Sequence, residues 1–323
     1  MSRPILVRMA ALVGGALLAC AHGRGAGAPE GDGSGAVALH FAWPDGYRSH
    51  VLVAHQSRRR GSEPTGLIAR QRLVTEKKGD EIWVLTRDTA ARGNEPDLET
   101  TVKLNEALVQ VVGSDGRFLR AEGLDRALSL LKSGGGTDRE STRQALIRSV
   151  AMDWEVLVGA WTGQKLSPDE ARQKQLRGSV PLLGTAETLL DVEYMLEGRV
   201  PCTDEEKDRK CVALSYRTRI APEDRAATVE RIRRAVSSKP EDPVPEDVHA
   251  DAETLLVVEP DTLLPHRFTQ RESLRVRMKF PDGRVQEADE RSEDVYLFSD
   301  RPPNGPEEKD GGTVPWEGTP RDL

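Results

Sequence analysis

The sequence predicts an α+β fold, in which an antiparallel and strongly curved sheet carries central helices packed on one side. Three observations lead to this class. Segments in which apolar and polar residues alternate with period two lie at both ends of the chain, whereas segments with helical spacing lie in its middle. The alternating segments are joined by short turns, and no repeating β-α-β unit is visible.

Four strands are expected at the start of this body, at residues 37–43, 47–56, 67–75 and 82–87. The sequence Pro44-Asp45-Gly46 has the residues of a tight turn, and so does the segment 77–80. These four segments predict an antiparallel meander.

The middle of the chain is predicted to be helical. A short strand is expected at 118–119, after a turn at 114–116. Helices are predicted at four places: a segment that ends at Gly113, the apolar stripe at 124–131, the segment after the capping box at 137–140, and the segment after a second capping box at 167–170.

Strands return in the last third of the chain, around a helix at 222–237. The turn at 281–283 is expected to join two long strands, 266–280 and 284–298. That register places Arg277 near Glu287 and Arg275 near Asp289, as cross-strand ion pairs on a solvent face.

The N-terminal segment has the proportions of a signal peptide. Arg3 and Arg8 form a positive region, and residues 9–19 are apolar. This run is too short to span about 30 Å of hydrocarbon as a helix. It leads into the sequence Leu17-Leu18-Ala19-Cys20, which resembles the lipobox of bacterial lipoproteins.

The resemblance implies that Cys20 is the mature N-terminus and carries the lipid. Residues 1–19 are then a signal peptide, 20–36 the lipidated cysteine and a flexible Gly-rich tether, 37–300 the folded domain, and 301–323 a disordered tail. Ala21, rather than Asp, follows the cysteine, which favours the periplasmic face of the outer membrane. The other interpretation is an uncleaved hydrophobic N-terminus with an incidental cysteine.

Two further cysteines, Cys202 and Cys211, bracket a polar segment between two alternating segments, 190–197 and 212–219. This pattern predicts a β-hairpin whose cysteines lie opposite each other. The export signal implies an oxidising compartment, where disulfides persist. We therefore predict a Cys202–Cys211 disulfide, which contributes about 2–3 kcal/mol by closing its loop.

The body resembles the half-barrel of the periplasmic lipoprotein-carrier and lipid-binding lipoprotein families. The likeness is carried by the alternation, the central helices and the segment Glu259-Pro260-Asp261 before long paired strands. The layout also resembles that of other Gram-negative envelope lipoproteins without an assigned function. These resemblances imply a protein that binds lipid or other hydrophobic ligands.

Known catalytic and nucleotide-binding motifs are absent from the sequence, so no catalytic residue and no cofactor is predicted. A net charge of −7 argues against a nucleic-acid partner. If the segment 247–253 is extended, it projects four candidate metal ligands to one side: Asp247, His249, Asp251 and Glu253. The other interpretation is a solvated acidic segment, because neighbouring side chains on one face lie roughly 6.5–7 Å apart.

Two functions remain open. The first is a lipid-anchored, non-enzymatic envelope protein that binds a hydrophobic ligand or another envelope component. An enclosed apolar cavity of roughly 300 Å³ or more would favour the ligand. The alternative is a secreted hydrolase with a scattered, metal-assisted site near His249, which requires a cleft with convergent polar groups and a perturbed acid or base.

Overall fold

The computed structural model describes residues 35–131, 139–168, 170–179, 187–203, 210–236 and 242–301. The predicted signal peptide, Cys20 and nearly all of the tether lie outside the described residues, as do Thr137 and the predicted tail beyond Arg301. Within the described ranges, no helix is both long and apolar enough to cross a membrane.

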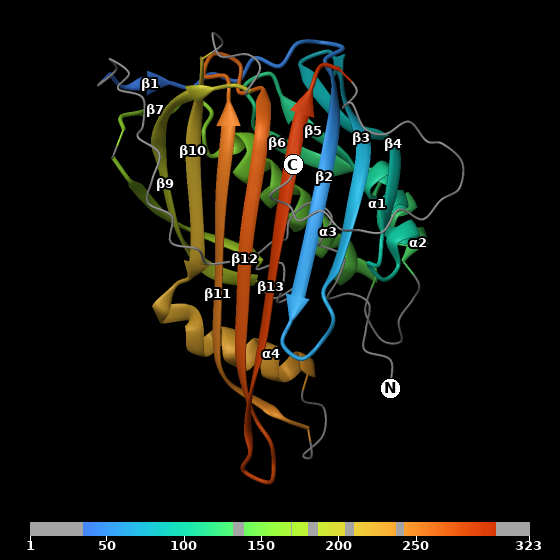
Figure 1. Ribbon diagram of the computed structural model, residues 1–323, viewed down its shortest axis with the longest axis vertical. Coiled ribbons are helices and arrows are strands. Elements are labelled where there is room, and N and C mark those ends of the chain that lie inside the picture. Colours follow the sequence, from blue (N-terminus) through green and yellow to red (C-terminus); the bar gives the residue numbers. More distant parts are fainter. Residues whose placement is uncertain are drawn as a thin grey trace.

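One 11-stranded antiparallel sheet dominates the molecule (Figure 1). Its strand order is β6-β5-β4-β3-β2-β13-β12-β11-β10-β9-β8, so the first and last long strands of the chain, β2 and β13, are neighbours. The strands are β2 (Arg48–Arg59), β3 (Thr65–Lys78), β4 (Glu81–Gly93), β5 (Val109–Gly113), β6 (Phe118–Glu122), β8 (Arg172–Ser179), β9 (Glu187–Pro201), β10 (Lys210–Ile220), β11 (Val244–Val258), β12 (Pro265–Lys279) and β13 (Val285–Ser299).

The predicted α+β class is wrong. Strands hold 55% of the described residues and helices 22%, so the protein is mostly one large sheet with few helices. In the view of Figure 1, α1, α2 and α3 lie behind the sheet, and α4 crosses its lower end. The helices are α1 (Leu98–Ala107), α2 (Leu124–Leu130), α3 (Arg139–Trp154), the π-helix η2 (Glu155–Gly159), the 3₁₀ turn η4 (Pro222–Asp224) and α4 (Arg225–Val236).

Two predicted helices account for much of this error. The segment before Gly113 divides into α1 and strand β5, because Val109, Val111 and Val112 are β-branched and pair with β4. The second capping box begins no helix, since Glu170 N donates to Ser167 O in a turn and strand β8 follows. A capping pattern stabilises a helix only where the following residues can bury a helical face.

The strands at 48–93 form the predicted antiparallel meander, but the segment at 37–43 is not part of it. β1 (Val37–Ala38) pairs with β7 (Lys165–Leu166) instead. His40 N and Ala42 N then donate to Pro260 O and Thr262 O in the β11–β12 turn, at 2.9 and 3.1 Å. The alternation in this segment correctly indicated buried side chains, but it does not say which backbone they pair with.

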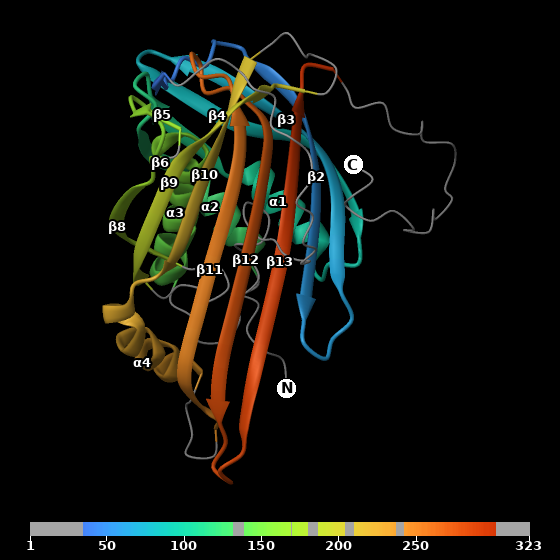
Figure 2. The same ribbon diagram turned by 60° about the vertical axis from the view of Figure 1, so that its left-hand side comes forward.

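The two faces of the sheet have different environments. The inner face carries side chains such as Val53, Leu214 and Leu256, which are at most 2% exposed. They pack in one core with Trp154 and Trp161, from the end of α3 and the residues after η2. The outer face carries the alternate residues of the same strands, which are mostly charged and in contact with solvent. Figure 2 shows the sheet from the side, with α1–α3 beyond strands β11–β13.

A second, smaller core lies among α1, α2, α3 and β6. It consists of Leu104, Ala107, Ala121, Leu124, Ala127, Leu128, Leu146 and Val150. The turn from β6 into α2 depends on Gly123, which has φ +77°, because a Cβ there would lie 1.8 Å from Ala107 O.

The register of the last two strands is as predicted: Arg277 pairs with Glu287, and Arg275 with Asp289. The ion pairs, however, are formed along other directions. Arg277 Nη2 lies 3.1 Å from Glu246 of β11. Exposed arginines choose among several nearby carboxylates at little energetic difference, so register alone does not determine the pairing.

Candidate functional site

A row of polar side chains crosses the inner face at one level. The strand registers place these residues opposite one another: His55 on β2, Asp294 on β13, Gln270 on β12, Thr254 on β11 and Tyr216 on β10. Residues directly opposite each other in adjacent strands share a face of the sheet. Glu272 also faces inward, two residues along β12 from Gln270. The row therefore interrupts a face that is otherwise aliphatic and aromatic.

His55 and Asp294 form a buried pair within this row. His55 Nδ1 lies 2.9 Å from Asp294 Oδ1, and the two side chains are 2% and 1% exposed. His55 and Asp294 are 239 residues apart in sequence and meet because β2 and β13 pair in the middle of the sheet. Because a buried charge is costly without a partner, each of these groups depends on the other.

Glu272 is the one acidic residue of β12, and it is buried. The residue is 3% exposed, and its Oε1 accepts a hydrogen bond from Gln270 Nε2 at 2.7 Å. Its Oε2 is buried without a hydrogen-bond partner. Burial raises the pKa of Glu272 to about 7, the Asp294 charge adds to the increase, and the Gln270 bond and His55 oppose it. Glu272 therefore exchanges a proton near neutral pH.

Asp153 approaches the same region from the helical side. It is the penultimate residue of α3, directly before η2, and Val150 and Trp154 anchor this turn in the two cores. Its Oδ2 is also buried without a partner. Burial raises the pKa of Asp153 well above its usual value, and the charges of Glu272 and Asp294 add to the increase. π-helical turns occur frequently at functional sites, which singles out this junction.

Two cavities meet at Asp153. The larger, of about 110 Å³, lies between α1, α3 and strands β2–β5, β12 and β13, and most of its walls are apolar. Its apolar lining includes Val51, Leu73, Val84, Leu108, Val150, Leu157, Phe268 and Phe298. The smaller, of about 50 Å³, lies between α3 and β9–β12 and is lined by Glu272 and Tyr216 as well as Asp153.

This arrangement joins apolar walls to two convergent acids, Asp153 and Glu272, whose pKa values are raised by burial. Such a combination is the usual signature of a binding pocket for a small molecule. The larger cavity is smaller than the roughly 300 Å³ of a typical ligand pocket, so it suits a small ligand or one end of a longer one.

The predicted metal ligands lie elsewhere, on the outer face of β11. His249 Nε2 is 3.0 Å from Asp247 Oδ2, and Glu253 accepts a hydrogen bond from Arg217 at 2.8 Å. Asp251 lines an outer groove instead. Within the described ranges, the one cluster with at least three potential ligand atoms within 4.8 Å of one another is Cys202, Cys211 and His266. The candidates at 247–253 are thus not brought together around a common point.

The predicted Cys202–Cys211 disulfide is confirmed. It joins the ends of β9 and β10, with the two Cα atoms 4.9 Å apart. Cys202 is 5% exposed and Cys211 is fully buried. His266 lies beside it and is bound to Glu259, with Nε2 3.1 Å from Oε1. Since both sulfurs are bonded to each other, this cluster has a structural role.

His55, Asp153, Glu272 and Asp294 were not singled out from the sequence. A signal for two of them, Glu272 and Asp294, exists in the alternation itself. Glu272 has the same parity on β12 as Phe268 and Leu274, and Asp294 the same parity as Tyr296, so each acid occupies an inward position. Asp153 has no comparable signal, because its environment depends on how α3 sits on the sheet.

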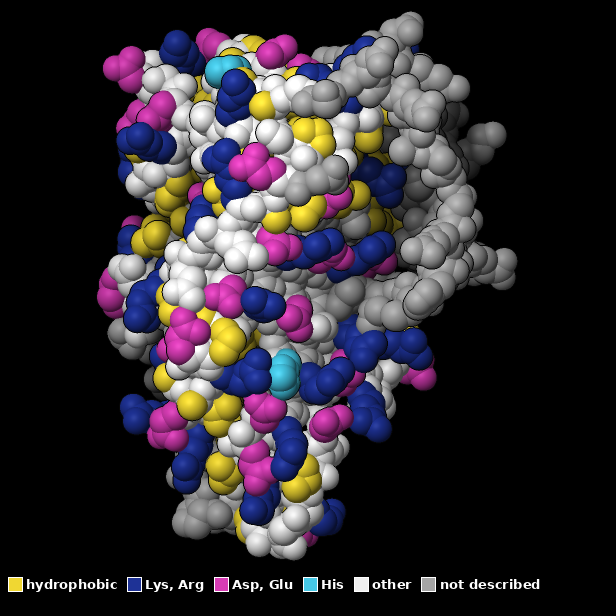
Figure 3. All heavy atoms as spheres, turned by 90° about the vertical axis from the view of Figure 1, so that its left-hand side faces the viewer, with side chains coloured by type: hydrophobic (Ala, Val, Ile, Leu, Met, Phe, Trp, Pro, Cys, Tyr) yellow, Lys and Arg dark blue, Asp and Glu magenta, His cyan; other side chains and the backbone are white. Residues whose placement is uncertain are grey.

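The outer face of β8–β12 contains a groove of about 630 Å³. A ladder of alternating polar side chains crosses it: Gln173, Glu193, Arg217, Glu253, Arg271 and Glu293. Arg217 Nε bonds Glu253 at 2.8 Å, and Arg271 Nε bonds Glu293 at 2.9 Å. Figure 3, which shows the side with β9 and β10, has basic and acidic side chains interspersed.

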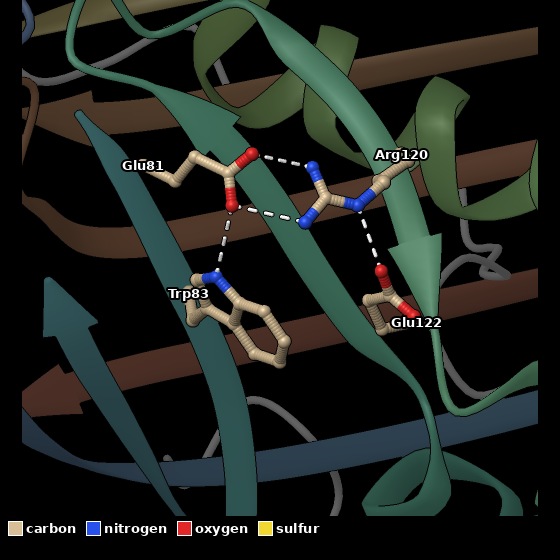
Figure 4. A network of polar contacts seen from close by, with 4 residues as sticks. All are labelled: Glu81, Trp83, Arg120 and Glu122. Carbon is tan, nitrogen blue, oxygen red and sulfur yellow. Dashed lines mark hydrogen bonds and ion pairs between the residues drawn. The ribbon is translucent and has the colours of Figure 1, made fainter. Parts of the chain in front are cut away.

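Another polar cluster lies near the β6 edge of the sheet (Figure 4). Arg120 of β6 reaches across β5 to Glu81 of β4, with Nη2 2.9 Å from Oε2, and its Nε bonds Glu122 at 2.7 Å. Trp83 Nε1 donates to Glu81 at 3.2 Å, and Lys78 Nζ lies 3.5 Å from the Trp83 ring centroid. The Arg120 hydrogen bond, above all, lowers the pKa of Glu81. Each charged group has an opposite partner, so the cluster serves strand registration.

Comparison with known proteins identifies no family. No family model matches the sequence, and no curated protein matches it. Among solved structures, the chain is similar to one described as "Lipid-protein interactions in lipovitellin", with a TM-score of 0.42 and 9% sequence identity. The match covers 80% of this chain and 25% of that chain. A likeness at this level carries no argument about function.

Proposed function

We propose that the protein is a lipid-anchored, non-enzymatic protein of the cell envelope that binds a small amphipathic ligand between its sheet and α3. The single observation that carries the proposal is the position of Asp153. Its carboxyl group lies where the larger, mostly apolar cavity meets the smaller one, which Glu272 and Tyr216 also line. An apolar group in the first cavity and a polar head near Asp153 would satisfy both surfaces.

The binding part of this proposal is tested by blocking the larger cavity. Leu73 lies on its wall and is only partly buried, so Leu73→Trp fills the cavity from the side of β3. We expect the variant to lose binding of 1-hexanol, a small uncharged amphipathic probe, in isothermal titration calorimetry. Leu255→Trp, at a 41% exposed site on the outer face, is the matched control. Equal probe binding by both variants would contradict the proposal.

The anchor is tested separately. Buried acyl chains contribute about 0.8 kcal/mol per methylene, so a lipidated Cys20 would hold the chain firmly in a membrane. The chain is acidic, with a net charge of −7, so anionic lipid headgroups would add no attraction. Cys20→Ser should therefore move the protein from the membrane to the soluble fraction. Retention of the variant in the membrane would show that the lipoprotein assignment is wrong.

A second candidate function is binding of a polar envelope component in the outer groove. Its volume of about 630 Å³ is within the range of ligand sites, and the charged ladder offers donors and acceptors in alternation. Arg219 and Asp191 both line the groove. Replacing both by Ala should reduce crosslinking of the protein to native envelope material while probe binding in the inner cavity is unchanged.

The hydrolase alternative required a cleft with a perturbed acid or base near His249. In the described structure, His249 is an exposed residue paired with Asp247, and it lines none of the three described hollows. The acids with raised pKa values are instead on the other face of the sheet. We therefore place no catalytic role at His249, and His249→Ala should leave both ligand binding and stability nearly unchanged.

A further inference from the structure

The smaller cavity has an unusual set of unpaired polar atoms. Asp153 Oδ2, Glu272 Oε2 and Tyr216 Oη are each buried without a hydrogen-bond partner, and all three residues line this cavity. Tyr216 and Glu272 are 2% and 3% exposed. Buried polar atoms without partners are rare in folded proteins, because each costs the free energy of its lost hydration. Three around one cavity indicate a missing hydrogen-bonding group.

The volume limits what that group can be. At about 50 Å³, the cavity has room for roughly three or four water-sized groups. A compact head group enters, whereas a phosphate ester with its substituents is too large. Any apolar body attached to the head must lie elsewhere, and the 110 Å³ cavity on the other side of Asp153 is the available space.

The charges around the cavity determine which head group is favoured. Three carboxyl groups, Asp153, Glu272 and Asp294, face one buried imidazole, His55. Two other acids come near. Asp251 lines the cavity from β11, and the charge of Glu155, which is paired with Lys174 at 2.7 Å, adds to the increase that burial causes in the pKa of Tyr216. Once Asp153 and Glu272 are ionised, the surplus is negative. A cationic head is attracted there, and a carboxylate or sulfonate is repelled.

We propose that this cavity binds the ammonium head of a small alkylamine, with Asp153 and Glu272 as its acceptors and the alkyl chain in the larger cavity. An ammonium group has three N–H donors and no acceptor, which complements the unpaired oxygens. The inference rests on the proposed function and specifies its ligand class.

The inference predicts a proton release. An alkylammonium ion is already charged at neutral pH, and its charge favours the ionised form of a neighbouring carboxyl group. Glu272 has a pKa of about 7 in the free protein, so part of the population is protonated at pH 7 and loses that proton when the cation binds. Binding should therefore release a fraction of a proton to the buffer.

The experiment is isothermal titration calorimetry of the full-length chain carrying Cys20→Ser, purified without detergent. The probes are hexylammonium, 1-hexanol and hexanoate, which share one alkyl chain and differ in their head. We expect hexylammonium to bind about tenfold more tightly than hexanol, because the charge of its head interacts with the carboxyl groups. Hexanoate should bind most weakly of the three. Titration in phosphate and in Tris at pH 7 should reveal the proton release through the different ionisation enthalpies of the buffers.

Glu272→Gln is the test variant, since it keeps the shape and removes a buried acid, which favours folding. It should lower the affinity for hexylammonium about tenfold, reduce the proton release and leave hexanol binding within about twofold. Asp153→Asn provides a second, independent variant from the helical side. Glu293→Gln is the matched control, because Glu293 lies one residue from Asp294 but faces outward, bound to Arg271.

The outcomes separate this inference from the proposed function. If hexylammonium and hexanol bind wild-type protein equally, or if Glu272→Gln binds the amine normally, the cavity holds water and the ammonium assignment is wrong, although ligand binding stands. If none of the three probes binds, both proposals fail.

Discussion

Acidic residues on the two faces of this sheet have the same chemistry and opposite environments. Glu293 and Asp294 are adjacent in β13. Glu293 faces outward and is bound by Arg271 at 2.9 Å, in a ladder of alternating charges. Asp294 faces inward, is 1% exposed and is paired with His55. Adjacent residues of β12 also differ in exposure, since the Arg271 side chain is 52% exposed and Glu272 is 3% exposed.

The environment of a carboxyl group in this sheet therefore depends on the face to which the pleat directs it, and not on the residue type. Side chains one position apart lie on opposite faces, so a step along the strand moves an acid from solvent to a low-dielectric interior. Outer acids pair with exposed arginines and contribute to register, with small individual free energies. The inner acids Asp153 and Glu272 have raised pKa values, which make the interior sensitive to pH and to bound charge. Four experiments test this contrast.

The largest effect is expected at the buried pair. His55→Ala leaves the Asp294 carboxylate without its imidazole partner in a buried site, which should cost about 3–5 kcal/mol of unfolding free energy. Urea denaturation followed by tryptophan fluorescence measures this change. The outer counterpart, Arg271→Ala, breaks the bond to Glu293 and should cost no more than about 1 kcal/mol. Equal losses in the two variants would refute the contrast.

The next effect is a pH dependence with an unusual sign. The folded-state pKa of Glu272 is about 7, against an ordinary 4.5, so the folded protein binds this proton more tightly than the unfolded chain does. The stabilisation is present below pH 4.5 and is lost as the pH rises through about 7, a change of about 3 kcal/mol. Asp153 shifts in the same direction and adds to this loss.

Glu272→Gln should therefore reduce the decrease in stability between about pH 5 and pH 8. Thermal unfolding across this range measures it, and Glu293→Gln provides the control with an outer acid. An unchanged slope in Glu272→Gln would mean that Glu272 remains ionised in the folded protein.

A smaller effect is expected in the outer ladder. Arg217 is 49% exposed and bridges Glu193 and Glu253, at 3.6 and 2.8 Å. Arg217→Ala should lower the unfolding free energy by about 0.2–1 kcal/mol in dilute buffer, and the difference should largely disappear in about 1 M salt because exposed charges are screened. A loss that persists in high salt would show that the outer ladder acts through packing rather than charge.

The smallest effect is expected at the edge cluster of Figure 4. Arg120→Ala removes the contacts to Glu81 and Glu122, all on an exposed part of the sheet. We expect a slight decrease in melting temperature and no change in ligand binding. Hydrogen exchange of the amides of β6 is the sensitive measurement, since loss of the Arg120 ion pairs should accelerate fraying of this edge strand. Exchange in β12 and β13 should be unaffected.

Much of the local structure was predictable from the sequence. Alternation located most of the long strands, and the turn at 281–283 established the register that places Arg277 opposite Glu287. The spacing of Cys202 and Cys211 was sufficient for the disulfide. The fold class was not predictable in the same way, because the valines at 109–112 are compatible with either a helix or a strand, and the available β4 edge decided between them.

The candidate site shows the same limit more strongly. The alternation in β12 was sufficient to place Glu272 on the inner face. Its proximity to His55, however, depends on the pairing of β2 with β13, which come from opposite ends of the chain. The environment of Asp153 depends on α3 lying against the inner face. Neither contact has a signature in local spacing.

The sequence alone was sufficient for features that depend on neighbours along the chain: strand alternation, hairpin turns and the cysteine pair. The tertiary structure was needed for the sheet order, for the replacement of one predicted helix and the end of another by strands, and for the position of Asp153 and Glu272 around one cavity. The reason is the distance along the chain over which each effect acts. Propensity and pattern act over a few residues, whereas burial, and with it the pKa of an acid, depends on which distant segments exclude water from it.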